Sequence, residues 1–179
     1  MPTSEEALAL AAPYTGFFRP GLPGVPLHRM HCTLLHTVGL PFEGIDLDAL
    51  LDDVEVWARE VQPFTLTFDR PAIGNVAVEL SGWPGGPFTG IVEAVTQSMV
   101  RTGAEFTSAP SRYPHMSLAY TSEGSDSIES GSLKAALAAL DGPLSGTVLA
   151  DRLHLVEQWH DGTQILWEPI AEVPLGAAA

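Results

Sequence analysis

Two short stretches of the chain each combine a histidine with a hydroxyl residue two positions later. They are His31-Cys32-Thr33-Leu34 and His115-Met116-Ser117-Leu118, and each reads histidine, apolar, hydroxyl, apolar. In a β-strand, residues two apart share one face and lie roughly 6.6 Å apart along the strand. Each stretch would then present an imidazole and a hydroxyl on one face. Two imidazoles are sufficient for an acid and a base to act together on one phosphate.

Three residues beside these stretches are candidates for binding a substrate. Arg29 stands two positions before His31, on the same face of the expected strand, where it could clamp a phosphate. Arg112 and Tyr113 precede His115, and Tyr113 could stack on a nucleobase. The alternative for all three is an ordinary surface position.

The other histidines and the cysteine give weaker signals. His28 and His31 have a spacing that suits a metal only on a helix, and this stretch reads as a strand, so no metal site is predicted. Cys32 alternates with His31 and points the other way, which predicts a buried thiol rather than a nucleophile. Structural positions are expected for the remaining histidines, His36, His154 and His160.

Composition restricts the classes of partner. The 179 residues carry a formal net charge of −14 with only eight Lys plus Arg, which argues against binding to long duplex nucleic acid. No apolar run approaches the roughly 18 residues of a membrane helix. The single cysteine excludes an intramolecular disulfide, and the absence of a basic segment before Glu5 argues against a secretory signal. A cytoplasmic location is therefore expected.

Residue periodicity and turn signals predict a mixture of helices and strands. Helices are expected at about Ser4–Phe17, Asp46–Val61, Thr89–Arg101 and Ser132–Leu140. Strands are expected at about Leu27–Val38, Phe64–Asp69, Val76–Leu80, Arg112–Thr121, Thr147–Gln158 and Thr163–Ile170. The segments Gly82–Pro87 and Ser122–Gly131 read as loops, the second of them mobile, and Gly74-Asn75 and His160-Asp161-Gly162 read as turns.

The two halves of this pattern repeat. Helix, motif strand, helix and hairpin occur once before Leu80 and once after Pro87, which predicts a duplicated α-β-α-β-β unit. We expect a single α+β domain over residues 1–179, with two pseudo-symmetric lobes and antiparallel sheets around a central cleft. The lobes would correspond to about 1–81 and 82–179, with a possible exchange of terminal strands. A pseudo-two-fold axis would place both motifs across that cleft.

With these motifs in a duplicated α/β chain, the sequence resembles the 2H phosphoesterases, specifically their bacterial RNA 2′,3′-cyclic phosphodiesterase (2′-5′ RNA ligase) branch. That family is named for two His-x-Thr/Ser-x motifs, matched here at His31–Leu34 and His115–Leu118. The strand at Phe64–Phe68, Gly74 after it, and Trp167 in the final strand also fit. One departure is that family members usually begin with a strand, and none precedes Ser4 here. Either the start is shortened, or the strand Thr163–Ile170 covers the sheet edge that such a first strand would occupy.

The resemblance implies a metal-independent, cofactor-free hydrolase that opens 2′,3′-cyclic phosphate ends of RNA or small cyclic nucleotides. His31 and His115 would be the acid and base, in an order that the sequence leaves open, while Thr33 and Ser117 would bind phosphate oxygens. The acidic chain favours short RNA ends or small nucleotides as partners. Two alternatives stay open: a nucleotide or RNA-end binding module with little turnover, and a metal hydrolase that uses scattered histidines.

Overall fold

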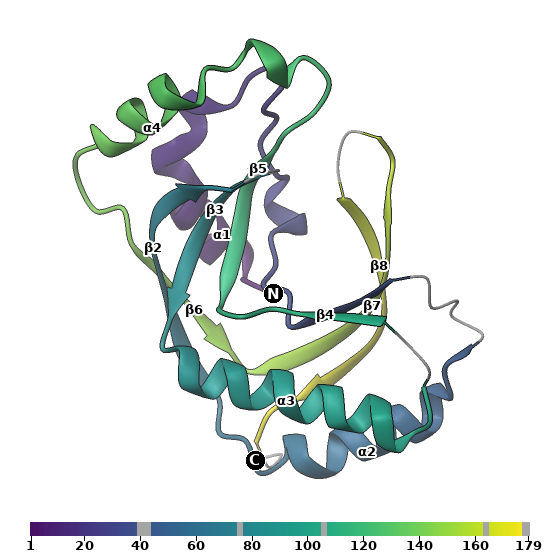
Figure 1. Ribbon diagram of the computed structural model, residues 1–179. Helices are drawn as coiled ribbons and strands as arrows, with labels where there is room; N and C mark the ends of the chain where they lie inside the picture. The colour runs from purple at the N-terminus through teal and green to yellow at the C-terminus, as the bar shows by residue number, and fades with distance from the viewer. Residues whose placement is uncertain (39–43, 75–76, 105–106, 163–164, 177–179) are drawn as a thin grey trace.

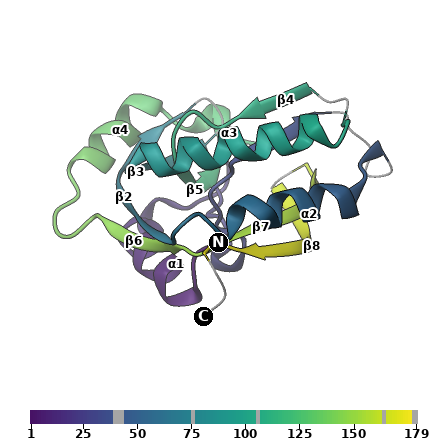
Figure 2. The same ribbon diagram turned by 90° about the horizontal axis from the view of Figure 1, so that it is seen from below.

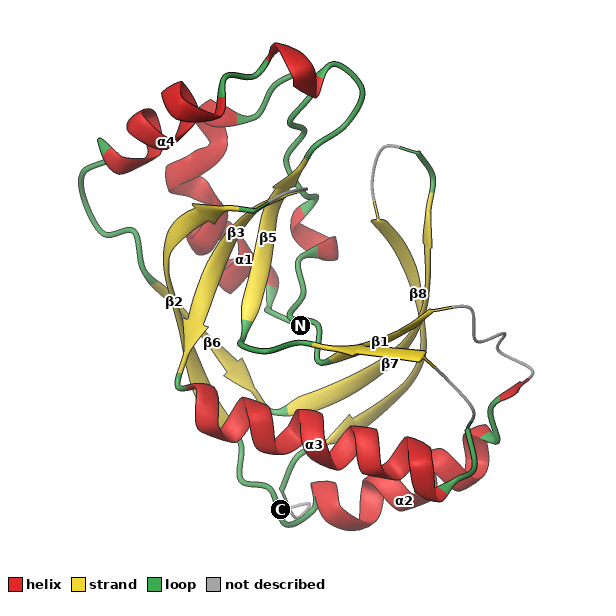
Figure 3. Ribbon diagram, viewed as in Figure 1, coloured by secondary structure: helices red, strands yellow, loops and turns green. Residues whose placement is uncertain are grey.

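The protein is a mixed α+β structure in which antiparallel strands of the described residues form three sheets, with α1 and α4 at one end of the molecule and α2 and α3 at the other (Figure 3). This computed structural model describes residues 1–38, 44–74, 77–104, 107–162 and 165–176. The α-helices are α1 (Ser4–Ala11), α2 (Leu47–Ala58), α3 (Gly85–Arg101) and α4 (Ser130–Ala138). The strands are β1 (Leu35–Val38), β2 (Phe64–Ile73), β3 (Ala77–Trp83), β4 (Thr107–Pro110), β5 (His115–Tyr120), β6 (Gly146–Ala150), β7 (Arg152–His160) and β8 (Ile165–Pro174).

The first lobe is built on a four-stranded antiparallel sheet of order β5-β3-β2-β6, packed against α1 and α4 (Figure 1). Its core includes Phe68 and Leu80, which are fully buried. A capping box at Thr3 starts α1, since the Thr3 hydroxyl accepts from Glu6 N–H while the Glu6 side chain accepts from Thr3 N–H. The sheet supplies the rigid frame for the second motif.

The second lobe holds the paired strands β1-β4 and β7-β8, with α2 and α3 side by side against them (Figures 1 and 2). Asp46 caps α2 by accepting from Ala49 N–H at 3.1 Å. Trp57 Nε1 donates to Ser98 Oγ at 3.0 Å, which joins α2 to α3. The buried cluster between them and β8 includes Val54, Ile91 and Val173.

The two lobes do not follow the predicted division near residue 81. The first lobe combines β2 and β3 with β5 and β6, and the second combines α2 with α3 and β8, so each draws on both halves of the chain. The expected α+β class and the antiparallel sheets are confirmed. The sequence repeat therefore describes the order of the elements and not the boundaries of the lobes.

Several predicted element boundaries are wrong. Gly82–Pro87 is not a loop, because β3 runs to Trp83 and α3 begins at Gly85. The expected strand Thr147–Gln158 is broken at Asp151 into β6 and β7. Ser122–Gly131 contains a 3₁₀ turn at Ser125–Ser127 and the start of α4, and β4 had no predicted counterpart. The predicted turn residue Asn75 lies outside the described residues.

The last strand does not cover the edge that the expected first strand would occupy. β8 pairs with β7 from Arg152 opposite Pro174 to His160 opposite Ile165, and within the described residues it pairs with no other strand. The alternative that Thr163–Ile170 closes this edge is therefore wrong for the described part of the chain. Among the described residues, no helix is both long and apolar enough to cross a membrane.

Candidate active site at the two histidine motifs

The second motif lies on β5 as its alternation predicts. Met116 and Leu118 are buried in the core of the first lobe, while His115 and Ser117 on the opposite face are partly exposed. Pairing with β3 places His115 opposite Ser81 and Ser117 opposite Glu79. A regular strand in a four-stranded sheet thus fixes the direction of both polar side chains.

The first motif is held differently, and here the prediction of a continuous strand over Leu27–Val38 is wrong. Leu27–Arg29 form a 3₁₀ turn, the motif itself has no regular secondary structure, and only Leu35–Val38 belong to β1. Pro26 precedes the turn and has no N–H for a strand ladder, which is one reason why regular pairing starts late. His31 and Thr33 are partly exposed and line a cavity of about 610 Å³.

The two motifs are brought together in the structure. The Cys32 thiol accepts a hydrogen bond from His115 N–H, which ties the first motif to the start of β5. Burial raises the pKa of that thiol to about 11, so Cys32 stays protonated at neutral pH. Cys32 was expected to be buried, and the structure leaves it partly exposed, while its raised pKa agrees with the expected unreactive thiol. Its contact with the backbone of His115 was not foreseen.

Both imidazoles are oriented by the same type of hydrogen bond. His31 Nδ1 lies 2.8 Å from Arg29 O, and His115 Nδ1 lies 3.3 Å from Tyr113 O, each a carbonyl two residues earlier. A carbonyl can only accept, so each Nδ1 carries the proton in this arrangement. The Nε2 atom of each ring is then the atom available for proton transfer.

The electrostatic surroundings favour a neutral His31. Burial is the main cause that lowers the pKa of His31, and the charges of the Met1 amine and of His115 lower it further. The hydrogen bond to Arg29 O opposes this shift. Because the charge of His115 acts on His31, the two rings are close enough to influence each other's protonation.

Two buried donors have no hydrogen-bond partner among the described residues. They are Arg29 Nη1 and Trp167 Nε1. The Trp167 ring meets the His31 ring edge-on, with centroids 6.3 Å apart. An unpaired buried donor costs about 1–3 kcal/mol, and a ligand that supplies an acceptor removes that cost. Trp167 is therefore a candidate donor beside His31. Arg29 stays a candidate for anion binding through Nη1, although its Nε donates to His28 Nε2 at 3.4 Å and it is not among the residues that line the cavity with His31.

Arg29 has no carboxylate partner, a property that it shares with Arg19, Arg112 and Lys134 among the described side chains. Among the described residues, Arg59, Arg101 and Arg152 are each paired with an acidic side chain at 3.0 Å or less. No ion pair is found for Arg29 or Arg112 in the same part of the chain. Arg112 is exposed in the loop before β5.

Tyr113 takes part in a small polar cluster on the β5 face. Its hydroxyl donates to Glu79 Oε1 at 2.7 Å, a bond that raises the pKa of Tyr113, and its ring lies 5.6 Å from that of His115. Tyr120 shares a hydrogen bond with Ser117. Glu79 was missed in the sequence, where it reads as an exposed residue of an alternating strand, and only the pairing of β3 with β5 brings it beside Ser117.

The other four histidines are not part of the His31–His115 pair. His28 and His36 are exposed, and His160 Nδ1 accepts from Gly162 N–H in the turn after β7. His154 faces Glu172 at 3.5 Å, and burial lowers the pKa of His154. No group of three or more His, Cys, Asp or Glu side chains suited to a metal ion is found in the described ranges.

Comparison with solved structures identifies the fold. A structure described as a phosphoesterase has a TM-score of 0.67 with 16% identity over 98% of this chain and 95% of its own. E. coli LigT complexed with 3'-AMP has a TM-score of 0.64 with 16% identity over 98% of this chain and 94% of its own. The protein TT0787 of Thermus thermophilus has a TM-score of 0.64 with 18% identity over 98% of this chain and 93% of its own. The chain has the fold of these proteins, as its resemblance to the 2H phosphoesterases predicted.

Comparisons by sequence add no relative. No family model matches the chain, and no curated protein matches it.

Proposed function

We propose that the protein is a phosphodiesterase that hydrolyses 2′,3′-cyclic phosphate ends of short RNA or small cyclic nucleotides, with His31 and His115 as its acid–base pair. One observation carries this proposal. Two histidines from separate motifs lie within electrostatic range, each with Nδ1 held by a backbone carbonyl and Nε2 left for proton transfer. That is the arrangement that concerted acid–base chemistry at one phosphorus requires.

The roles of the two rings follow from their surroundings. The lowered pKa of His31 keeps it neutral at pH 7, so we assign it as the base that removes a proton from water. The water oxygen bonds to phosphorus, the bond from phosphorus to O3′ breaks, and protonated His115 delivers its Nε2 proton to O3′. The product is a 2′-phosphate and a free 3′-hydroxyl. The step leaves His31 protonated and His115 neutral, and exchange of protons with solvent then restores the starting state of both rings.

Donors around the pair would stabilise the phosphate. Thr33 and Ser117 would donate to non-bridging oxygens as negative charge grows on them. The unpaired Arg29 Nη1 would form a charge-assisted hydrogen bond to the same group. Tyr113, beside His115, offers a ring on which a base could stack. Arg112 would contribute charge at the entrance.

Small nucleotides are the favoured substrate class. The solved LigT structures include complexes with 3'-AMP, NADP+ and ATP. The net charge of −14 opposes long polyanions, whereas one or two arginines suffice for a single phosphate. A nucleotide-binding module with little turnover is the second candidate, since the same donors would bind a product.

The deciding experiment offers a panel of 2′,3′-cyclic nucleotides and cyclic-phosphate-ended oligonucleotides to the protein in excess EDTA. We expect hydrolysis with a 2′-phosphate as product, identified by phosphorus NMR. Tight binding of the product without turnover would favour the binding module. Activity that disappears in EDTA and returns with a divalent metal would favour a metal hydrolase, and either outcome overturns the proposal.

The pH dependence of kcat/KM should reflect the protonation of His31. As the base, His31 must be neutral, so the rate falls only as the pH drops through its lowered pKa. The acidic limb of kcat/KM should therefore lie below pH 6.5, the ordinary value for histidine. NMR titration of the His31 ring should likewise give a midpoint below pH 6.5. An acidic limb above pH 6.5 would contradict His31 as the base.

Replacement of Arg29 should weaken binding more than it slows chemistry. Loss of one charge-assisted hydrogen bond, about 1.5–3 kcal/mol, predicts an increase in KM of roughly 10–150-fold for Arg29→Ala. Steady-state kinetics with the best substrate of the panel would measure it. The control is Arg59→Ala, since Arg59 is exposed directly after α2 and paired with Glu55. Equal KM values for the two variants would remove Arg29 from the site.

A further inference from the structure

Glu79 places a carboxylate on the sheet face that carries the second motif. The pairing of β3 with β5 sets Glu79 opposite Ser117 and Ser81 opposite His115, and all four residues are partly exposed. Directly opposed residues of an antiparallel pair have Cβ atoms about 4.5–5.5 Å apart. Glu79 therefore lies next to a group proposed to bind phosphate, although like charges repel and a phosphate alone gives no reason for a carboxylate there.

A bulge in β5 adds Tyr120 to the same face. The pairing of β3 with β5 shifts register beside Glu79, and the consecutive residues Leu118 and Ala119 are both buried. Bulges redirect side chains and are common beside active sites. Tyr120 shares a hydrogen bond with Ser117; burial is the main cause that raises the pKa of Tyr120, and the charge of Glu79 raises it further. Glu79 therefore lies within electrostatic range of this tyrosine as well.

Tyr113 holds the Glu79 side chain in place and leaves it able to accept more hydrogen bonds. The Tyr113 hydroxyl donates to Glu79 Oε1 at 2.7 Å, which fixes the direction of both side chains. Tyr113 is 45% exposed, so part of its ring is open to a stacked ligand. No ion pair is found for Glu79 in the described ranges, and a carboxylate has about four acceptor positions. A ligand stacked on Tyr113 can therefore donate to Glu79 from its edge.

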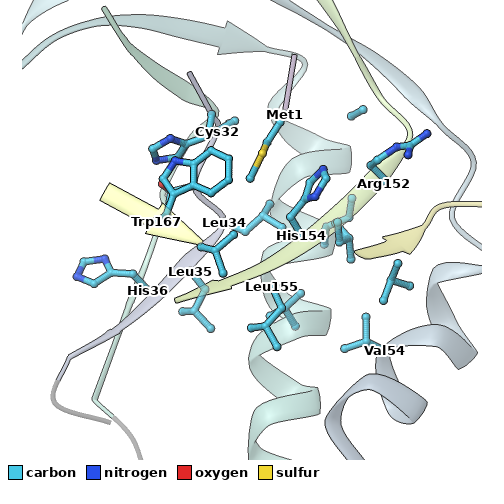
Figure 4. Close-up of a pocket in the computed structure, with 18 of the residues that line it drawn as sticks. Met1, Cys32, Leu34, Leu35, His36, Val54, Arg152, His154, Leu155 and Trp167 are labelled. Carbon is cyan, nitrogen blue, oxygen red and sulfur yellow. The ribbon is translucent and has the colours of Figure 1, made fainter. Parts of the chain in front are cut away.

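The opposite side of the site offers a donor instead of an acceptor. Figure 4 shows Trp167 and Cys32 on one side of the cavity, and the buried Trp167 Nε1 has no hydrogen-bond partner among the described residues. An indole N–H can only donate, which suits a phosphate oxygen, whereas a carboxylate can only accept. The site therefore orients a nucleotide with its phosphate toward His31 and its base toward β3.

We propose that Glu79 and Tyr113 form a base-recognition pair that selects guanine, an inference that rests on the nucleotide phosphodiesterase function proposed above. The Watson–Crick edge of guanine places two donors side by side, N1–H and the 2-amino group, and a carboxylate can accept from both. Adenine and cytosine offer an amino group next to a ring nitrogen that is itself an acceptor. Uracil offers one N–H between two carbonyls. Each of these three bases would bring an acceptor against the carboxylate. Stacking on an aromatic ring combined with hydrogen bonds to the base edge is a common way to recognise single-stranded RNA.

The experiment measures the binding of guanosine, inosine, adenosine and uridine 2′-monophosphates by isothermal titration calorimetry. Inosine differs from guanosine only by the missing 2-amino group. We expect the unmodified protein to bind the guanosine ligand at least about tenfold more tightly than the inosine ligand, since one charge-assisted hydrogen bond is lost. In Glu79→Gln this ratio should fall below about threefold. The adenosine ligand should gain on the guanosine ligand, because an amide pairs well with adenine. The matched control is Glu93→Gln, an exposed glutamate on α3, which should keep the original preference.

The pattern across the four ligands separates recognition from a structural role. A structural role for Glu79 would weaken all four ligands by the same factor in Glu79→Gln, and that result would overturn the pair. Equal affinity for the guanosine and inosine ligands in the unmodified protein would also overturn it. Tyr113→Phe, which keeps the ring and removes the bond to Glu79, should reduce the guanosine preference in part.

The same ligands keep this inference separate from the proposed reaction. They are of the product type and are not consumed, so their binding does not depend on turnover. Hydrolysis of cyclic phosphates without a preference for guanine would overturn the recognition pair and support the phosphodiesterase. Selective binding of the guanosine ligand without hydrolysis would overturn the phosphodiesterase and support the pair. No binding of any of the four ligands at millimolar concentration would overturn the pair.

Discussion

The replacement of either motif histidine by alanine should lower kcat by about 10²–10⁴, the usual contribution of a positioned acid or base. In the proposed mechanism, His31→Ala would remove the imidazole that accepts a proton from water, and His115→Ala would remove the donor to the leaving oxygen. Both side chains are partly exposed, so the fold should survive either change. Turnover of the best cyclic phosphate at its pH optimum is the measurement.

The double variant provides the sharper test of a shared step. Residues that act as a unit are not additive, so His31→Ala with His115→Ala should lose much less than the product of the two single losses. His36→Ala is the matched control, because His36 is an exposed histidine on β1. Near-normal turnover in a folded single variant, or full additivity in the double variant, would contradict paired-histidine catalysis.

Deletion of β8 should abolish cooperative folding. A chain that ends at Gly162 loses the only described partner of β7 and two residues of the second core, Val173 and Leu175. Burial of two such side chains contributes about 3–6 kcal/mol, comparable with the total stability of a typical domain of 5–15 kcal/mol. The hydrogen bond from Gly176 N–H to Ala58 O, which joins the chain end to α2, disappears as well.

Thermal unfolding followed by circular dichroism would show this effect. The truncated chain should have no sharp transition, whereas a control chain that ends at Gly176 should melt like the full-length protein. A truncated chain with a melting temperature within a few degrees of the full-length value would mean that the β8 hairpin is dispensable.

The sequence pattern identified the second motif better than the first. In β5 the alternation of His115, Met116, Ser117 and Leu118 is a direct consequence of one buried and one open face, so the prediction needed only local information. The first motif has the same pattern, but the 3₁₀ turn before it departs from strand geometry. Its position depends on contacts with β4 and β5 that local periodicity does not encode.

The residues that were missed depend on long-range pairing. Glu79 reads as an ordinary exposed strand residue until β3 pairs with β5, and Trp167 approaches His31 only through the packing of the last hairpin. The repeat of elements predicted two lobes, yet it could not reveal that strands from both halves share one sheet. Periodicity describes which face of an element is buried. It does not say which element lies against that face.

The interleaving of the lobes has a consequence for how the molecule can move. The chain passes from α1 in the first lobe to β1 and α2 in the second, returns for β2 and β3, and crosses again for α3, β5 and β7. A hinge normally needs only a few residues that absorb the rotation of one rigid body against another. Here, several connections would have to bend at once, and the thiol of Cys32 ties the motifs together as well. Rotation of one lobe against the other is therefore restrained, and the distance between His31 and His115 should stay nearly constant when a ligand binds between them.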